Sequence, residues 1–325
     1  MDSAIIVVND EPYSIWEVSL SEKNLAYIEG IDVDYFQFLN EIYQKSEDSK
    51  RASIALRASL HHASETLFTL IGALLQAPFA VYAWASKCSN SELRTILKRI
   101  TDKDATLFVS YNLPVLTWEA VAEVVFQCYL PGTEKQKRTS QLFAAFWQRL
   151  SYEFCDKDHI NEYNSIKHGF RIRSGGFSLS MAEEKEYGVA PPASEMKLIG
   201  KSEYGSSFFV LREVGNKGSR ALTSRRISIN WKLEKVALLL QLVSMSINNV
   251  TNALKFINGV DAGNCKFTRP VQDSDFNDPW THTPGVTSCS FNLDVDESQV
   301  PNVGKKELLK KLQELKSATN DTAKS

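Results

Sequence analysis

Residues 232–258, KLEKVALLLQLVSMSINNVTNALKFIN, carry the most regular apolar pattern in the chain. Apolar side chains recur there at alternating steps of four and three residues, at Val236, Leu240, Val243, Ile247, Val250, Leu254 and Ile257. This spacing predicts one long helix with a single apolar stripe, and Gly259 supplies its C-terminal stop. Such a stripe packs on another helix, either inside the fold or across a dimer.

A second long helix is predicted upstream, over residues 51–76. Its apolar positions follow the same spacing, at Leu56, Leu60, Ala63, Leu67, Leu70 and Leu74. Pro78 ends it, because proline cannot donate the helical hydrogen bond and its ring collides with the preceding turn. Shorter helices are expected from residue 34 and over 79–87, 91–100, 116–129, 139–154, 158–168 and 304–316, with Ser91 and Asp158 as N-caps.

Alternating patterns predict β-structure at the N-terminus and in the middle of the chain. Residues 5–8 and 14–20 indicate one hairpin. Residues 170–173 with 177–180, and 196–203 with 207–214, indicate two more, followed by a strand over 224–229. The expected fold class is therefore mainly α (α+β), a multi-helix bundle with small antiparallel β-hairpins inserted before the long helix of the C-terminal half.

Four segments are expected along the chain. Residues 1–50 hold the N-terminal hairpin and a helix, and residues 51–169 form the helical bundle. Residues 170–259 contain the hairpins and the long helix that packs on the bundle. Residues 260–325 are rich in loop residues and hold a short amphipathic helix, with Leu308, Leu312 and Leu315 on one side, and a loose tail from residue 317.

Composition restricts the classes of function. The 325 residues include 37 Lys and Arg and 39 Asp and Glu, so the positive and negative charges nearly balance. This balance argues against binding of nucleic acid over the whole surface, but it still allows a local basic patch. The five cysteines are scattered without zinc-finger spacing. The most apolar segment, 236–247, is too short for a membrane span of about 20 residues. The chain start lacks a secretion signal, so a cytoplasmic protein without membrane contact is expected.

One polar cluster is predicted on the helix over 51–76. His61, His62 and Glu65 follow one another at i, i+1 and i+4, and Arg57, His61 and Glu65 lie in one file along the helix surface. A metal-dependent enzyme is one interpretation, and a polar stripe between helices is the other. The His-His-x-x-Glu pattern lacks the second set of ligands that a metal site requires, so no resident metal is expected. No phosphate-binding GxxxxGK[ST] or GxGxxG motif occurs, and no nucleotide or other cofactor is expected.

A second cluster ends the helix over 158–168. Asn164 and His168 share one helix face, and Lys167 and Arg171 add positive charge beside them. The helix dipole favours an imidazolium at a C-terminus, and a histidine beside fixed cations is what phosphodiester cleavage requires. These four residues are the candidate catalytic group. The alternative is a histidine that caps its own helix while the charges remain in water.

The helical arrangement together with Asn164-x-x-x-His168 at the end of a late helix resembles the HEPN-type helical domains. The resemblance covers residues 51–173. It implies a metal-independent ribonuclease in which four to six residues separate an Arg from the His that follows it, and two copies meet across a dimer. Here those positions hold Tyr163, Glu162 and Asn161, so only His168 carries over. An inactive or binding-only version is therefore implied alongside an active one.

A local basic patch is predicted in the β-rich middle. Its candidate nucleic-acid-binding residues are Arg173, Lys217, Arg220, Arg225 and Arg226. They would contact phosphates without reading sequence if the hairpins pack together, and a solvated loop is the simpler alternative. Three functional hypotheses follow, in this order: a HEPN-like protein that binds RNA or cleaves it, a non-catalytic protein-interaction module, and, as a distant third, the metal-dependent enzyme. Expected partners are RNA, a second copy of the chain, or a helical protein.

Overall fold

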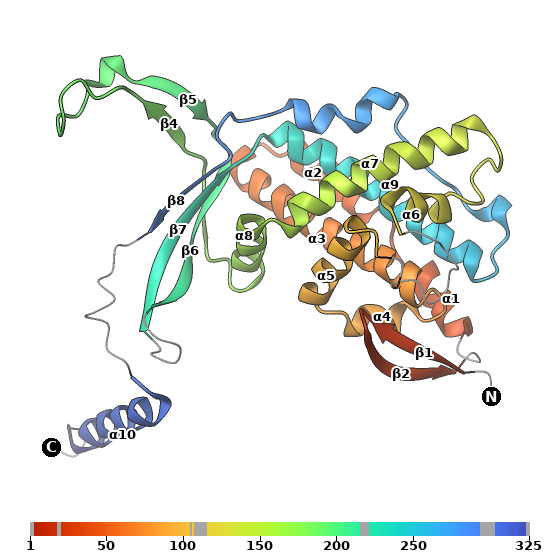
Figure 1. Cartoon of the computed structure of the whole chain (residues 1–325), viewed down its shortest axis with the longest axis horizontal. Helices are drawn as coiled ribbons and strands as arrows, with labels where there is room; N and C mark the ends of the chain where they lie inside the picture. The colour runs from red at the N-terminus through yellow and green to blue at the C-terminus, as the bar shows by residue number, and fades with distance from the viewer. Residues whose placement is uncertain are drawn as a thin grey trace.

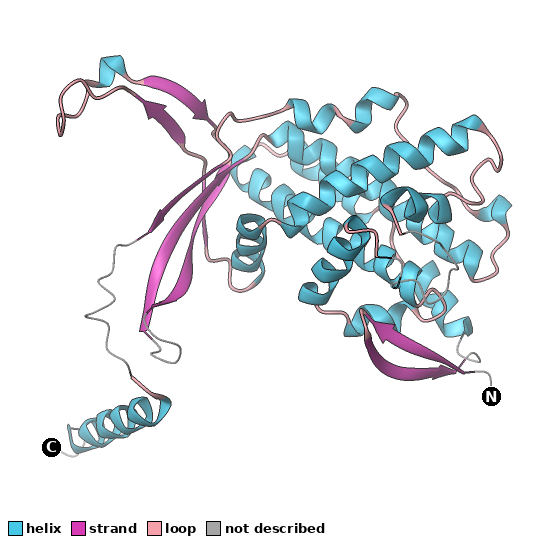
Figure 2. Ribbon diagram, viewed as in Figure 1, coloured by secondary structure: helices cyan, strands magenta, loops and turns pink. Residues whose placement is uncertain are grey.

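A body of packed helices carries a protruding arm of antiparallel strands in the computed structural model of the chain (Figures 1 and 2). The structure describes residues 3–17, 21–104, 106, 116–214, 221–292 and 303–322. Helices dominate and the strands form small antiparallel sheets, so the mainly α (α+β) class is confirmed.

The core of the body is built around α9, Leu233–Ile257. It packs against α3, Ser49–Gln76, and α2, Tyr35–Gln44 (Figure 1). Apart from the terminal Ile257, every residue of the predicted apolar stripe of α9 is buried. The stripe therefore packs inside the fold, and the alternative of a dimer seam is not needed to bury it.

Further helices surround this pair. They are α1 (Ser21–Glu29), α4 (Val81–Lys87), α5 (Asn90–Thr101), α6 (Trp118–Val125), α7 (Glu134–Cys155) and α8 (Lys157–Lys167). The predicted caps were wrong by two residues: Ser89 caps α5 and Asp156 caps α8. Helix α1 was missed, because its sequence has no clear apolar period.

The N-terminal hairpin is confirmed as β1, Ser3–Val8, paired with β2, Glu11–Glu17. Asn9 in its turn has φ of 57°, a left-handed conformation that asparagine tolerates better than most residues. Near the C-terminus, α10 extends over Lys305–Thr322, so the tail predicted from residue 317 is helical as far as residue 322.

The arm holds a four-stranded sheet with the order β3-β6-β7-β8. These strands are Ile172–Ser174, Gly205–Val214, Ala221–Asn230 and Ser288–Asn292. A separate two-stranded sheet pairs β4, Ser178–Met181, with β5, Lys197–Lys201. Strand β8 was not predicted, and 260–292 otherwise contains short 3₁₀ turns at Ala262–Asn264, Asp273–Phe276 and Asp278–Thr281.

Both predicted central hairpins were wrong in their pairing. Strand β3 pairs with β6, and the next strand, β4, pairs with β5 in the other sheet. The chain leaves the first sheet at Gly176, where an added Cβ would lie 2.3 Å from the carbonyl oxygen of Ser202. Alternation predicts that a strand exists, but its partner depends on such tertiary contacts. The real long hairpin is β6 with β7, paired in register from Gly205–Asn230 to Val214–Ala221.

Candidate functional site

His168 and its neighbours lie together at the exposed end of α8. The backbone N–H of His168 donates to the carbonyl oxygen of Asn164 at 3.0 Å, so His168 is the C-cap residue of the helix. Lys167 Nζ lies 3.3 Å from Glu65 Oε1, and Arg171 reaches the Asn164 carbonyl oxygen at 3.5 Å. The four predicted catalytic residues are thus neighbours, but all are exposed and none lines the pocket described below.

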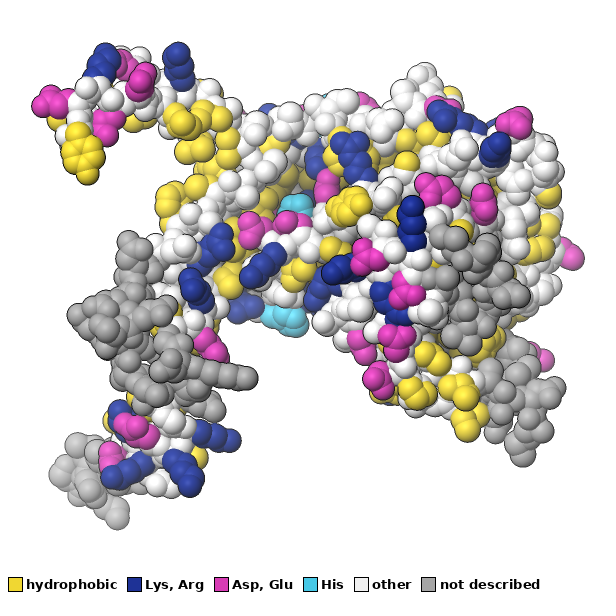
Figure 3. Space-filling view, in the orientation of Figure 1, with side chains coloured by type: hydrophobic (Ala, Val, Ile, Leu, Met, Phe, Trp, Pro, Cys, Tyr) yellow, Lys and Arg dark blue, Asp and Glu magenta, His cyan; other side chains and the backbone are white. Residues whose placement is uncertain are grey.

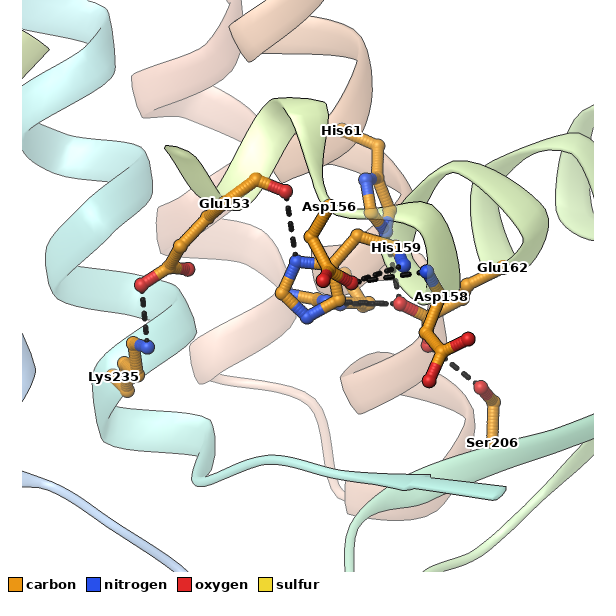
Figure 4. Close-up of polar contacts among 9 residues, drawn as sticks. His61, Glu153, Asp156, Asp158, His159, Glu162, Ser206 and Lys235 are labelled. Atoms are coloured by element: carbon orange, nitrogen blue, oxygen red, sulfur yellow. Dashed lines mark hydrogen bonds and ion pairs between the residues drawn. The ribbon is translucent and has the colours of Figure 1, made fainter. Parts of the chain in front are cut away.

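A buried charge network lies deeper between α3 and α8, and Figure 4 shows most of its members. The Glu162 carboxylate is fully buried. Arg57 donates to its Oε2 from Nε at 3.0 Å and from Nη2 at 2.8 Å. His61 Nε2 lies 3.0 Å from the same oxygen, and Ser206 Oγ of β6 donates to Oε1 at 2.6 Å. Because a carboxylate only accepts, His61 carries its proton on Nε2.

The electrostatics of this network favour one buried positive and one buried negative charge. Arg57 and Glu162 neutralise each other, so a second proton on His61 would add an uncompensated charge to a dry site. Burial and Arg57 accordingly lower the pKa of His61 to about 4, despite the carboxylate beside it. Arg57 and His61 hold the pKa of Glu162 well below its usual range and outweigh the effect of burial.

The structure separates the residues of the predicted metal cluster. His61 bonds to Glu162, and His62 packs edge-on against Phe36. Glu65 instead accepts from Asn90 and pairs with Lys167. In the described part of the chain, no three His, Cys, Asp or Glu side chains are grouped so that they could hold a metal ion.

A pocket of about 460 Å³ opens where the helical body meets the arm. Its walls come from the α7–α8 junction, the end of β7, the start of α9 and the loop around Trp280. His159 stands in this wall, and its Nδ1 lies 3.0 Å from the carbonyl oxygen of Glu153 (Figure 4). The Glu153 carboxylate is held at 2.7 Å by Lys235 and at 2.8 Å by the Trp280 indole N–H.

The outward face of the four-stranded sheet carries two exposed aromatic rings, although Ser228 on the same face is buried. Phe209, Arg226 and Phe291 lie directly opposite one another on β6, β7 and β8. Directly paired residues point to the same side of a sheet. Phe209 is 67% exposed and Phe291 63% exposed, and Arg226 between them is exposed as well. On the opposite face, Phe208 and Ile227 are buried in the hydrophobic core, whereas Arg212 is exposed.

The predicted basic patch is only partly brought together. Arg173 pairs with Ser207 and so shares the outward face with Arg226, about 12 Å away by strand geometry. Arg225 points to the other face and donates to Ser290 Oγ at 2.6 Å. Lys217 and Arg220 lie outside the described residues. Figure 3 shows Lys and Arg side chains gathered over α8 and the adjoining strands.

Several of these residues had no signal in the sequence. Arg57 and Glu162 are 105 positions apart, and only the fold reveals that they pair. Phe209 and Phe291 belong to strands whose partners were predicted wrongly or not at all. An alternation of apolar residues along 205–214 could have indicated that Phe209 and Leu211 share one face.

Comparison of the chain with models of known protein families, with curated proteins and with solved structures found no match. Among the described residues, no single helix combines the length and apolarity of a membrane span. Helices α3 and α4 would do so only as a pair, which is bent by 119°.

Proposed function

We propose that the protein binds single-stranded RNA on the outward face of the β3-β6-β7-β8 sheet. The observation that supports this most strongly is the exposed cross-strand row Phe209–Arg226–Phe291. Two aromatic rings on a sheet can each stack on an unpaired base, and a guanidinium between them can contact the phosphate or stack in turn. Arg173 extends the row toward the edge strand β3.

Charge supports a polyanionic ligand in this part of the molecule. Of the four arginines in these strands, Arg173 and Arg226 lie on the outward face with one acid, Glu213, and Arg212 and Arg225 alternate to the other face. Phosphate contacts from such residues add affinity that falls as salt rises. The local excess of positive charge is notable in a chain whose net charge is −2. All five cysteines are unpaired, which suits the reducing cytosol in which we place the protein.

The proposal concerns binding, and cleavage would be a separate activity. The resemblance to HEPN-type domains offers His168 as the residue for cleavage, with Lys167 and Arg171 beside it. His168 is exposed, and the arginine of the family motif is replaced. We therefore expect RNA to be bound and released intact, and we expect His168→Ala to leave binding by the sheet unchanged.

Fluorescence anisotropy with a labelled, uridine-rich RNA strand tests the binding proposal. Phe209→Ala and Phe291→Ala should each weaken binding by about 5- to 100-fold, which is the loss of affinity expected when one base loses its aromatic stacking partner. Arg226→Gln should weaken binding as well. It should also reduce, by about one, the slope of the logarithm of the binding constant against the logarithm of the salt concentration. Phe38→Ala is the matched control, because Phe38 on α2 is similarly exposed, at 58%, but lies away from the sheet.

Two results would contradict RNA binding on this face. The first is absence of binding by the native protein at low salt. The second is an unchanged affinity in both phenylalanine variants, since stacking would then occur elsewhere. Gel analysis of the same RNA after incubation separates binding from cleavage: cut RNA that His168→Ala leaves intact would assign a ribonuclease activity to His168.

A second candidate function is self-association through α10. Leu308, Leu312 and Leu315 lie along one side of this helix and are 42–67% exposed. Lys311 with Glu307 and Lys310 with Glu314 form ion pairs beside them, as at the flanks of a helix–helix seam. Sedimentation should show a concentration-dependent dimer that Leu312→Asp abolishes, and a native monomer at all concentrations would rule this function out.

A further inference from the structure

A second pocket, of about 380 Å³, lies in the helical body between α5, the end of α7 and α8. Figure 1 shows α5 alongside the end of α7. One face of α5 forms the first wall, because its lining residues recur every three or four positions, at Ser91, Arg94, Lys98 and Thr101. Tyr152, Cys155 and Ile160 belong to the opposite wall. Only Tyr152 also lines the pocket at the junction of body and arm, so the two pockets are separate.

Two cations at this pocket have no counter-charge. Arg94 and Lys98 both line it, and in the described part of the chain neither side chain forms an ion pair or a hydrogen bond. Arg99 of the same helix, by contrast, is paired with Asp10 and Asp104. Like charges one turn apart on a helix repel each other. An anion bound beside Arg94 and Lys98 would therefore stabilise both.

The nearby acids are directed elsewhere. Among the described residues that line this pocket, none is acidic. Asp156 and Asp158, at the start of α8, line the pocket at the junction instead. Glu92 of α5 is engaged at the helix N-terminus by Ser89. The charge at the pocket is thus positive, although the chain as a whole has a net charge of −2, and it favours an anionic ligand.

The rest of the wall is largely apolar. Leu97 is buried, and Ile160 and Cys155 are half-buried. Burial raises the pKa of the Cys155 thiol and outweighs the opposing effect of Arg94, so the thiol lines the wall as a neutral group. Apolar surface of this kind gains free energy when a ligand displaces water from it.

We propose that this pocket binds one amphiphilic acid, which is an anionic head carried on an apolar chain. The head lies between Arg94, whose N–H groups match a carboxylate, and Lys98. The chain lies against Leu97 and Ile160. The volume of about 380 Å³ falls within the range of about 300–1,000 Å³ that is typical for small ligands. The site belongs to the helical body and is independent of the RNA face on the arm.

Calorimetric titration of the full chain with octanoate, a soluble acid with an apolar chain, tests the proposal. Octanoate should bind saturably. Octanol has the same chain without the charge, and it should bind at least about tenfold more weakly. Each methylene removed from the chain of the acid should weaken binding about fourfold, because its burial is lost. Acetate, which keeps only the charge, should show no measurable binding.

Two variants test the role of the cations. Arg94→Gln and Lys98→Gln each remove one charge, and each should weaken octanoate binding about three- to tenfold. Arg51→Gln is the matched control, because Arg51 on α3 is exposed, pairs with Asp48 and lies outside the pocket. This control should bind octanoate as the native protein does. Thermal melting of each variant must first show a folded protein.

Alkylation of Cys155 reports where octanoate binds. Octanoate should slow the reaction of this thiol with N-ethylmaleimide in proportion to the occupied fraction of the protein, as measured by peptide mass spectrometry. Cys128 lies outside the pocket and is also a free, half-buried thiol, so its rate should not change.

Four outcomes would overturn the proposal. The first is no saturable binding of octanoate up to about 10 mM, a concentration that detects millimolar affinity. The second is binding that octanol matches or that both charge variants leave unchanged. The third is an unchanged rate at Cys155 with octanoate bound, which would place the acid elsewhere. The fourth is displacement of octanoate by uridine-rich RNA, which would assign Arg94 and Lys98 to the RNA site.

Discussion

At the scale of single residues, Glu162 carries a negative charge that the fold must stabilise in its interior. Its carboxylate is fully buried, and Arg57, His61 and Ser206 donate to its two oxygens. A buried charge is tolerated only when it is paired and hydrogen-bonded. The position that the HEPN resemblance compares with a catalytic arginine thus holds an acid that ties α8 to α3 and to the sheet.

The state of His61 gives a pH dependence whose sign can be worked out. Its pKa falls from an ordinary 6.5 to about 4 on folding, so the unfolded chain binds more protons between these values. Stability should therefore fall as pH is lowered from about 6.5 to about 4, by roughly 3 kcal/mol. Glu162, whose pKa is depressed, stabilises the fold above its ordinary 4.5 and loses that contribution only at lower pH.

Urea unfolding at several pH values measures this effect. His61→Gln can still donate to Glu162 but does not titrate, so it should flatten the loss between pH 6.5 and 4. The remaining slope reports other groups, among them His159, whose pKa is also lowered. Parallel curves for the native protein and His61→Gln would show that His61 is not the group responsible.

Gly72 marks a close approach of α3 and α4. A Cβ at this position would lie 2.4 Å from Cη2 of the buried Trp84. Gly72→Ala should therefore destabilise the protein by about 1–3 kcal/mol, the usual cost of overpacking a core. Gly263→Ala is the control, since nothing lies within 4 Å of its added Cβ. A denaturation midpoint of Gly72→Ala equal to the native one would contradict the contact.

At the scale of elements, α5 shows how a cap decides where a helix begins. Ser89 Oγ accepts from the Glu92 backbone N–H at 3.3 Å, and the Glu92 carboxylate accepts from the Ser89 N–H at 2.7 Å. This reciprocal capping box satisfies two N–H groups that the helix itself cannot. Ser91 was the predicted cap and instead lies in the first turn.

The two serines form a matched pair for mutation. Ser89→Ala should cost about 1 kcal/mol of unfolding free energy, because it leaves the N–H of Glu92 without its acceptor. Ser91→Ala should change that free energy by less than about 0.5 kcal/mol, as surface substitutions usually do. Chemical denaturation of both variants decides the matter, and equal losses would refute the assignment of Ser89.

At the scale of the whole molecule, one hydrogen bond joins the sheet to the helical body at a buried charge. Ser206 of β6 donates to Glu162 Oε1 of α8 at 2.6 Å. The loop side of the same junction is held by Trp280, which donates to Glu153 of α7. The pocket lies between these two contacts, so its shape depends on how firmly the arm is seated on the body.

Ser206→Ala should loosen the arm more than the core. Removing a hydrogen bond to a buried charge costs about 1.5–3 kcal/mol. Hydrogen exchange should become faster in β6 and β7, while amides in the middle of α9 keep their protection, because α9 packs on α3 independently of Ser206. Uniform loss of protection over both regions would show that arm and body unfold as one unit.

The amino-acid sequence by itself determined the helical class, the long helices and the burial of the α9 stripe. These are local properties, since the 3.6-residue period, proline and glycine act within a few positions of the chain. It also located His168 beside Lys167 and Arg171, because a helix end places near neighbours together.

Only the tertiary structure decided which strands pair, and with them the row Phe209–Arg226–Phe291. It also joined Arg57 to Glu162 and placed His159 and Trp231 in one pocket. Each of these contacts links residues tens of positions apart or more. Strand patterns specify a face and not a partner, and a buried polar residue finds its counterpart only when the chain has packed.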